Sequence, residues 1–350
     1  MDLNWSLPDW SRVLGVPGIS GLLRTQHEDF RVEELPLVKP DGEGNHLWLE
    51  IEKRGANTDW VARQLASQAG VPGRDVGYAG MKDRHGVTSQ WFSIGLQEAR
   101  DTDWDQWQLP DAVILQAHRH HRKLKRGALR GNRFRIVARQ LEGCRDGLEE
   151  RLQQVAKLGV PNYFGPQRFG HGGLNVARGA HWLEHGGRIP RHKKSIYLSA
   201  VRSFLFNAVV SRRVGLGNWN QILDGEIASL DGSRSGFACR MPDPELERRC
   251  DEFDIHPSGP LPGSGGRQPE RDAAEIENEV LKPLGALIAG LEKAGLKSAR
   301  RSLRLVPGAM SWQCSDSELA LKFDLPPGAY ATAVLRELVS VGPVSISGNT

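Results

Sequence analysis

Asp83 stands in a run of ionisable residues that could do chemistry. The run 82–85 reads Lys-Asp-Arg-His, so one carboxylate lies among three basic side chains. Nearby positive charge favours the ionised form of a carboxylic acid, and an ionised carboxylate can serve as a nucleophile. Two segments with β-type residues, 76–81 and 88–94, flank a turn, and Gly80 and Gly86 permit backbone geometries there that other residues resist. The alternative is that Asp83 only forms this turn, which is the commonest role for an Asp between two strands.

A long basic run begins further along the chain, at His118, and ends at Arg139. It contains nine Lys or Arg, three His and no acid. Such a run is typical of a surface that binds phosphates, although a solvated basic face is the alternative. The residues expected to contact an RNA backbone are Arg122, Lys123, Lys125 and Arg126.

Asn132 lies inside this basic run, in the string Gly-Asn-Arg-Phe at 131–134. Its amide offers both a hydrogen-bond donor and an acceptor, which a protein needs to read the edge of a flipped-out base. The alternative is that Asn132 caps a turn. The neighbouring basic residues favour a base pocket.

Several strings along the chain resemble the TruD family of tRNA pseudouridine synthases. The most specific is GYAGMKDRHGVTSQWFS at 77–93, which contains Asp83. The others are EDFRVEE at 28–34, GNRF at 131–134, NYFGPQRFG at 162–170 and FDLPPGAYATAVLREL at 323–338. Together they span nearly the whole chain, so the chain is identified as similar to this family throughout.

The resemblance implies roles for individual residues. Asp83 is the implied nucleophile, and Arg24 is the basic residue that pairs with it. The residues implied to bind the substrate are Phe30, Asn132 and Tyr330, and Phe134 is implied to line the active site. Members of the family often have Phe where this chain has Tyr330. The string at 162–170 is interpreted either as a packed hinge or as an RNA-facing loop.

The resemblance also implies an α+β fold in two domains, as the length of 350 residues favours. Residues 1–157 and 303–350 are expected to form a discontinuous catalytic domain of the pseudouridine-synthase type, with a mixed, largely antiparallel sheet. Residues 158–302 are the expected α-rich inserted TRUD domain. Within it, Ser199 is predicted to cap a helix, and the Pro- and Gly-rich stretch 256–268 is predicted to be a loop.

Composition excludes several classes of protein. Hydrophobic content of 39% and charged content of 25% are typical of a folded chain, and no apolar run of about 18 residues is present to cross a bilayer. The start of the chain has no signal-peptide pattern, which predicts a cytoplasmic location. The four cysteines form no CxxC pair, so neither zinc nor a disulfide framework is expected.

The predicted reaction is the isomerisation of uridine to pseudouridine in tRNA, at uridine thirteen as the resemblance implies. We expect no cofactor and no metal, tRNA as the partner, no membrane, no obligate protein partner, and a monomer. The sequence leaves open whether the carboxylate attacks the ribose or the base. The alternatives are a noncatalytic RNA-binding protein and a glycoside hydrolase that uses Asp83 with Glu28 or Asp29.

Overall fold

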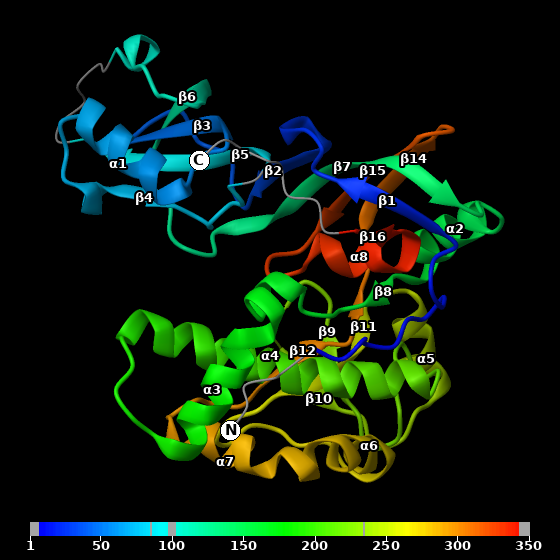
Figure 1. Cartoon of the computed structure of the whole chain (residues 1–350). Helices are drawn as coiled ribbons and strands as arrows, with labels where there is room; N and C mark the ends of the chain where they lie inside the picture. The colour runs from blue at the N-terminus through cyan, green and yellow to red at the C-terminus, as the bar shows by residue number, and fades with distance from the viewer. Residues whose placement is uncertain (1–6, 85, 97–102, 234, 343–350) are drawn as a thin grey trace. The chain divides into compact units, whose positions relative to one another are not determined.

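The computed structural model describes residues 7–84, 86–96, 103–233 and 235–342. The chain divides into two compact units, each made of segments distant in sequence (Figure 1). We call them the sheet unit (Gly18–Asp146, Pro307–Gly328 and Val339–Thr350) and the helical unit (Met1–Pro17, Gly147–Val306 and Ala329–Leu338). Their bounds differ from those of the two expected domains, whose functional division stays a prediction.

The sheet unit is built on a mixed sheet in the order β14-β15-β7-β2-β5-β3-β6, with β1 beside β7 and β4 beside β5. The strands are β1 (Ile19–Leu23), β2 (Phe30–Pro36), β3 (His46–Arg54), β4 (Val76–Tyr78), β5 (Val87–Gly95), β6 (Ala112–His120), β7 (Leu129–Gly143), β14 (Gly308–Cys314), β15 (Glu318–Leu325) and β16 (Ser340–Val341). Among the described strands β2 pairs with β5, and β1 with β16, in parallel, while the other pairs are antiparallel. The expected α+β class with a largely antiparallel sheet is therefore confirmed.

The helix α1 (Thr58–Gln68) covers part of this sheet and contacts β4 and β5 (Figure 1). Its apolar side chains Val61 and Leu65 are fully buried and pack in one cluster with residues of β3 and β5 such as Leu49 and Phe92. Burying an aliphatic or aromatic side chain of this size contributes about 1.5–3 kcal/mol, so this cluster fixes α1 on the sheet.

The segment around Asp83 is a hairpin with a longer loop than expected. β4 and β5 pair antiparallel from Val76↔Ile94 to Tyr78↔Phe92, which leaves residues 79–86 outside the ladder. Side chains take over the backbone hydrogen bonds there, because Gln90 Nε2 donates to the Gly80 carbonyl at 3.1 Å and the Lys82 N–H donates to Thr58 Oγ1 at 3.1 Å. The loop is thus held in place without continuing the strands. His85 lies outside the described residues.

The helical unit contains a helical layer and a small sheet. Its helices are α2 (Leu148–Leu158), α3 (Leu174–His185), α4 (Arg191–Gly215), α5 (Pro244–Asp251), α6 (Arg271–Leu281), α7 (Gly285–Lys293) and α8 (Ala331–Leu338). Its strands are β8 (Val160–Pro161), β9 (Ile227–Leu230), β10 (Gly236–Ala238), β11 (Ile255–Leu261), β12 (Ala299–Ser302) and β13 (Arg304–Leu305), with β10-β9-β11-β12 in one sheet and β13 paired with β8. No helix in the described ranges is long and apolar enough to cross a membrane.

The helix α4 runs through the centre of this unit's core, where Val201, Leu205 and Phe206 are fully buried. The prediction that Ser199 caps this helix is wrong. The helix begins at Arg191, directly after Pro190, and Ser199 lies in its interior. The stretch 191–198 continues the helix because it contains neither Gly nor Pro to end it.

The prediction of a loop at 256–268 is also wrong in part, because β11 occupies its first residues. β11 pairs with β9 through residues 255–257 and with β12 through residues 258–261. Proline cannot donate to a ladder, yet the Pro257 carbonyl accepts from the Leu303 N–H at 2.8 Å. Gly259 allows the side chains of Leu303 and Phe206 to approach its backbone closely. Pairing that the local sequence does not reveal therefore overrides the turn-forming composition.

Candidate active site

Arg24 and Asp83 form an ion pair on the sheet unit. Arg24 Nη2 donates to Asp83 Oδ2 at 2.5 Å, and the side chains are 29% and 36% exposed. Arg24 follows β1 and has a φ of 61°, a backbone conformation that residues other than glycine rarely adopt. The expected pairing is present. A carboxylate held at one oxygen by a guanidinium stays oriented while still in contact with solvent.

An aromatic row extends from this ion pair across the sheet. The Arg24 guanidinium lies 4.3 Å from the centre of the Phe30 ring. Phe30 meets Phe134 edge-on with ring centres 6.2 Å apart, and Phe134 stacks against Phe323 at 5.7 Å. These residues come from β2, β7 and β15, which are neighbours in the sheet. Phe30 and Phe134 are buried, so they form an apolar floor rather than an exposed stacking platform.

Lys82 connects the Asp83 loop to Asn132. Its Nζ donates to Asn132 Oδ1 at 2.8 Å and lies 2.6 Å from Glu34 Oε2. Glu34 and Asn132 sit opposite each other on β2 and β7. The Lys82 and Glu34 side chains are only 6% and 1% exposed, so this charge pair is buried. With Oδ1 occupied by Lys82, the amide Nδ2 is the group of Asn132 that can donate to a substrate.

Lys53 holds the backbone of the same loop from beneath. It is fully buried, and its Nζ donates to the carbonyls of Ala56 at 2.7 Å and of Asp83 at 3.1 Å. Burial lowers the pKa of Lys53 to about 8, while the Asp83 carboxylate opposes this shift and Lys82 adds to it. Lys53 and Lys82 therefore fix both the backbone and the surroundings of Asp83.

Comparison with known proteins establishes the family. A family model described as tRNA pseudouridine synthase D (TruD) matches residues 11–185 and 174–338. The chain is 44% identical over 338 residues to a tRNA pseudouridine synthase D of Hydrogenovibrio crunogenus, covering 96% of this chain and 97% of the relative. It is 47% identical over 337 residues to one of Methylococcus capsulatus, covering 96% and 95%. The chain belongs to the tRNA pseudouridine synthase D family.

The fold agrees with a solved structure described as a putative tRNA pseudouridine synthase D from Methanosarcina mazei. The two superpose with a TM-score of 0.74 at 24% identity, over 95% of this chain and 96% of the other. This likeness concerns the fold. The family predicted from the sequence, and with it the class of enzyme, are confirmed by the sequence comparisons.

Tyr330, the remaining residue implied to bind substrate, belongs to the helical unit. Its hydroxyl accepts a hydrogen bond from Arg168 Nε at 2.8 Å, and its ring meets Phe164 edge-on at 5.8 Å. Arg168 and Phe164 come from the TruD-like string 162–170, so two of the recognised strings meet within this unit. The convergence of Tyr330 with Phe30 and Asn132 on one pocket stays a prediction, as do the substrate-binding roles of all three.

The four residues expected to contact an RNA backbone differ in their surroundings. Arg122 and Lys125 are exposed. Lys123 donates through Nζ to the Arg74 carbonyl, and Arg126 lies 3.9 Å over the Tyr78 ring while donating to its hydroxyl at 2.5 Å. Two of the four are thus tied to the protein, and contact with RNA stays a prediction for each.

Sequence reasoning missed Lys53 and Glu34, although both left a signal in the strand pattern. Lys53 continues the alternation of Leu47, Leu49 and Ile51, so it points to the buried face of β3. Glu34 likewise follows Phe30 and Val32 on β2. A charged residue on the buried face of a strand is costly unless it is paired, so it marks a site that needs an explanation.

Asp29 and Glu28, the two partners in the glycoside-hydrolase alternative, are paired with residues other than Asp83. Although burial alone would raise it, the pKa of Asp29 is lowered by hydrogen bonds from Thr25, Arg139 and the Gln26 N–H. A general acid needs a raised pKa, so Asp29 is unsuited to that role. Glu28 pairs with Arg54 at 2.9 Å.

Proposed function

We propose that this protein isomerises uridine to pseudouridine in tRNA with Asp83 as the nucleophile. The observation that carries the proposal is the Arg24–Asp83 ion pair beside an apolar floor and an amide, in a chain of the tRNA pseudouridine synthase D family. The target position, uridine thirteen, rests on the family resemblance alone. A cytoplasmic location and action as a monomer remain predictions.

The reaction requires an exchange of bonds with no net loss of atoms. The glycosidic bond between N1 of uracil and C1′ of ribose breaks, and a bond between C5 and C1′ forms. C5 gives up its proton to solvent, and N1 acquires one. No electrons are transferred to or from a cofactor.

Asp83 supplies the nucleophilic oxygen in either of two routes. It can attack C1′ and form a glycosyl ester while uracil leaves, and C5 then displaces the carboxylate from C1′. Alternatively it can add to the base, and the carboxylate is eliminated from the base when C5, by then bonded to C1′, gives up its proton. Arg24 holds Asp83 Oδ2 at 2.5 Å and keeps the carboxylate oriented. Lys53 fixes the backbone of the same residue through its carbonyl.

The uracil must remain bound after its glycosidic bond breaks. A flipped base needs an apolar surface and a polar group for its edge. Phe30 and Phe134 offer the surface, and Asn132 Nδ2 offers a donor to a uracil carbonyl. Lys82 fixes the orientation of the Asn132 amide because it donates to Oδ1. Tyr330 is proposed to close the pocket.

A tritium-release assay tests the proposed function. A tRNA transcript labelled with tritium at C5 of its uridines releases the label to water when C5 bonds to C1′. We expect the wild-type protein to release label from the transcript and to lose that release when uridine thirteen is replaced by cytidine. No release from a correctly folded tRNA would contradict the proposed activity. Equal release from both transcripts would contradict the proposed target.

A further inference from the structure

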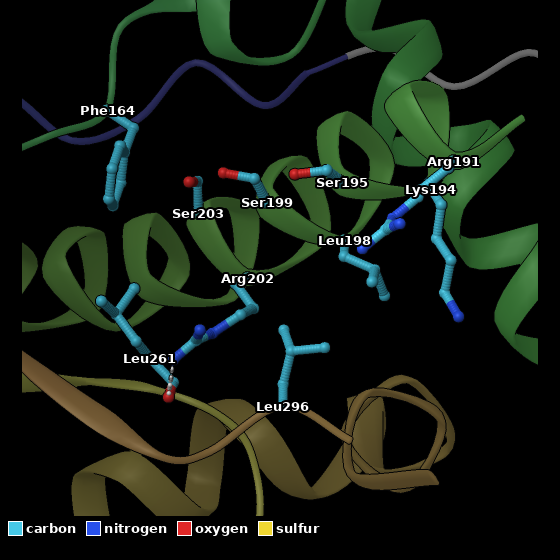
Figure 2. A pocket seen from close by; sticks show the side chains of 10 residues that line it. All are labelled: Phe164, Arg191, Lys194, Ser195, Leu198, Ser199, Arg202, Ser203, Leu261 and Leu296. Carbon is cyan, nitrogen blue, oxygen red and sulfur yellow. Dashed lines mark hydrogen bonds between the residues drawn. The ribbon is translucent and has the colours of Figure 1, made fainter. Parts of the chain in front are cut away.

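A pocket of about 450 Å³ lies along α4 in the helical unit (Figure 2). Its walls come from α4, from Phe164, from Leu261 at the end of β11 and from Leu296 after α7. Its volume lies in the range of small-molecule sites, about 300–1,000 Å³. Every lining residue belongs to the helical unit, so the pocket does not depend on the sheet unit.

Three serines line one side of this pocket. Ser195, Ser199 and Ser203 are four residues apart on α4, a spacing that puts them on one face of a helix, as Figure 2 shows. Ser195 is exposed, Ser199 is half-buried and Ser203 is buried. Hydroxyl groups thus follow the pocket from its mouth to its floor. Each can donate or accept a hydrogen bond.

Positive charge lines the pocket without acidic partners. Arg191, Lys194 and Arg202 contribute to the wall, no carboxylate does, and none of the three cations pairs with a carboxylate within the described residues. Arg202 Nη2 donates to the carbonyls of Leu261 at 2.8 Å and Lys297 at 3.1 Å, the first of which Figure 2 shows. Carbonyl groups leave its charge uncompensated, and its Nε is buried without a hydrogen-bond partner. Such a wall favours an anion.

The rest of the pocket is apolar. Leu261 and Leu296 supply carbon surface across from α4, and Phe164 and Leu198 add carbon surface next to the serines. The combination of cations at the mouth, hydroxyls along one side and apolar side chains at the other matches a phosphate joined to a sugar and a base. A free inorganic anion would use only the first of these features.

We infer that this pocket binds one nucleotide unit of the RNA substrate, with its phosphate at Arg191 and Lys194. The inference rests on the proposed action on tRNA and deepens it, because it adds an RNA contact in the helical unit. Arg191 and Ser195 are exposed at the mouth, so a nucleotide still joined to its chain can enter. Arg202 and the serines meet the sugar and the base edge.

Two variants test the inference against a matched control. The double variant Arg191→Ala/Lys194→Ala removes the mouth cations. Ser195→Trp blocks the mouth without changing charge. The control Lys193→Ala/Lys282→Ala removes two exposed cations that do not line the pocket. Far-UV circular dichroism and thermal melting verify that each protein folds.

Filter binding of a full-length tRNA transcript across a salt series gives the readout. We expect both pocket variants to bind about five- to tenfold more weakly than wild type, and the control to change by less than about twofold. The slope of log affinity against log salt is expected to become shallower by about 1 to 2 for the double variant only. Pocket variants that bind like the control overturn the inference.

Two further outcomes separate the sources of failure. One outcome is that free uridine monophosphate binds wild type but not the double variant, with tRNA affinity unchanged in that variant. In that case the pocket is a free-nucleotide site, and the RNA assignment is overturned. If wild type binds tRNA but releases no tritium, the proposed activity fails while the affinity comparison still tests the pocket.

Discussion

The basic run at 118–139 and the cations of the α4 pocket show opposite relations between sequence and charge. The run contains no acid, yet the fold supplies acids from other segments of the chain. Arg133 makes two hydrogen bonds to Asp324 at 2.8 and 2.9 Å, and Arg139 pairs with Asp29 at 2.7 Å. Part of the positive charge of the basic run is therefore neutralised within the protein.

The cations of the pocket on α4 show the reverse relation, because no neighbouring acid in the described part of the chain pairs with them. Arg191 and Lys194 lie close together in the sequence, and Arg202 follows eight residues after Lys194. Helical spacing brings all three to one pocket, and the nearby Arg168, which does not line the pocket, donates to Ser199 Oγ at 3.0 Å. None of the three lining cations has a carboxylate partner among the described residues. The positive charge that is available to a ligand depends on which acidic residues the neighbouring elements bring close. The length of a basic run in the sequence does not reveal those acids.

This comparison predicts that a cation with a carboxylate partner acts mainly on stability and that a cation without one acts mainly on RNA affinity. Lys82 gives the largest expected effect. Lys82→Met leaves Glu34 buried without its counter-charge and should cost about 3–5 kcal/mol in the free energy of unfolding. Urea denaturation measures it, with exposed Lys125→Met as the control, expected within about 0.5 kcal/mol of wild type.

A second substitution sharpens the test at this pair. Adding Glu34→Gln to Lys82→Met removes the unpaired charge and should restore at least half of the lost stability, because desolvation of a lone carboxylate is the main cost. A Lys82→Met protein as stable as Lys125→Met would break the distinction between the two kinds of cation.

The next effect concerns the basic run itself. Arg122→Ala/Lys125→Ala removes the exposed pair and should weaken tRNA binding about tenfold, with a salt slope shallower by about 2. Lys123→Ala/Arg126→Ala removes the pair tied to Arg74 and Tyr78, and should instead lower stability by about 1 kcal/mol with a smaller change of slope. Equal salt slopes for the two double variants would show that cations held by protein contacts and exposed cations in the run contribute equally to RNA binding.

The smallest effect comes from Lys53. Its pKa in the folded protein is about 8, below its value in the unfolded chain, so the unfolded state binds more protons above that pH. Stability should therefore rise with pH, by about 1 kcal/mol from about pH 7 to about pH 9. Urea midpoints of wild type and Lys53→Met across this range measure it. A pH dependence that survives in Lys53→Met would assign the effect to another group.

Much of the sheet unit could be predicted because its strands show alternation and its site lies in specific strings. The strands of β2 and β3, the helix α1 and the Asp83 hairpin follow from local pattern, and the Arg24–Asp83 pair follows from family resemblance. The role of Thr58 was missed. Thr58 is buried, and its hydroxyl accepts from the Lys82 N–H and donates to Gln90 Oε1 at 2.8 Å.

The helical unit was harder to predict because its elements are stabilised by contacts between residues that are distant in the sequence. β11 forms from a Pro- and Gly-rich segment because β9 and β12 pair with it on successive stretches. The buried Arg213–Glu226 pair, at 2.8 Å, joins α4 to the segment before β9, and no local pattern reveals it. The pocket on α4 was missed for the same reason, since its cations come together only in the folded unit.

Asp83→Asn tests the central claim most directly. The change removes the nucleophilic oxygen charge and leaves the size of the side chain nearly unchanged, so tRNA affinity should stay within about threefold of wild type. Tritium release in a single turnover at saturating protein should fall by at least about a thousandfold. A folded Asp83→Asn protein that binds tRNA and releases tritium at a rate near that of wild type would contradict the assignment of Asp83 as the nucleophile.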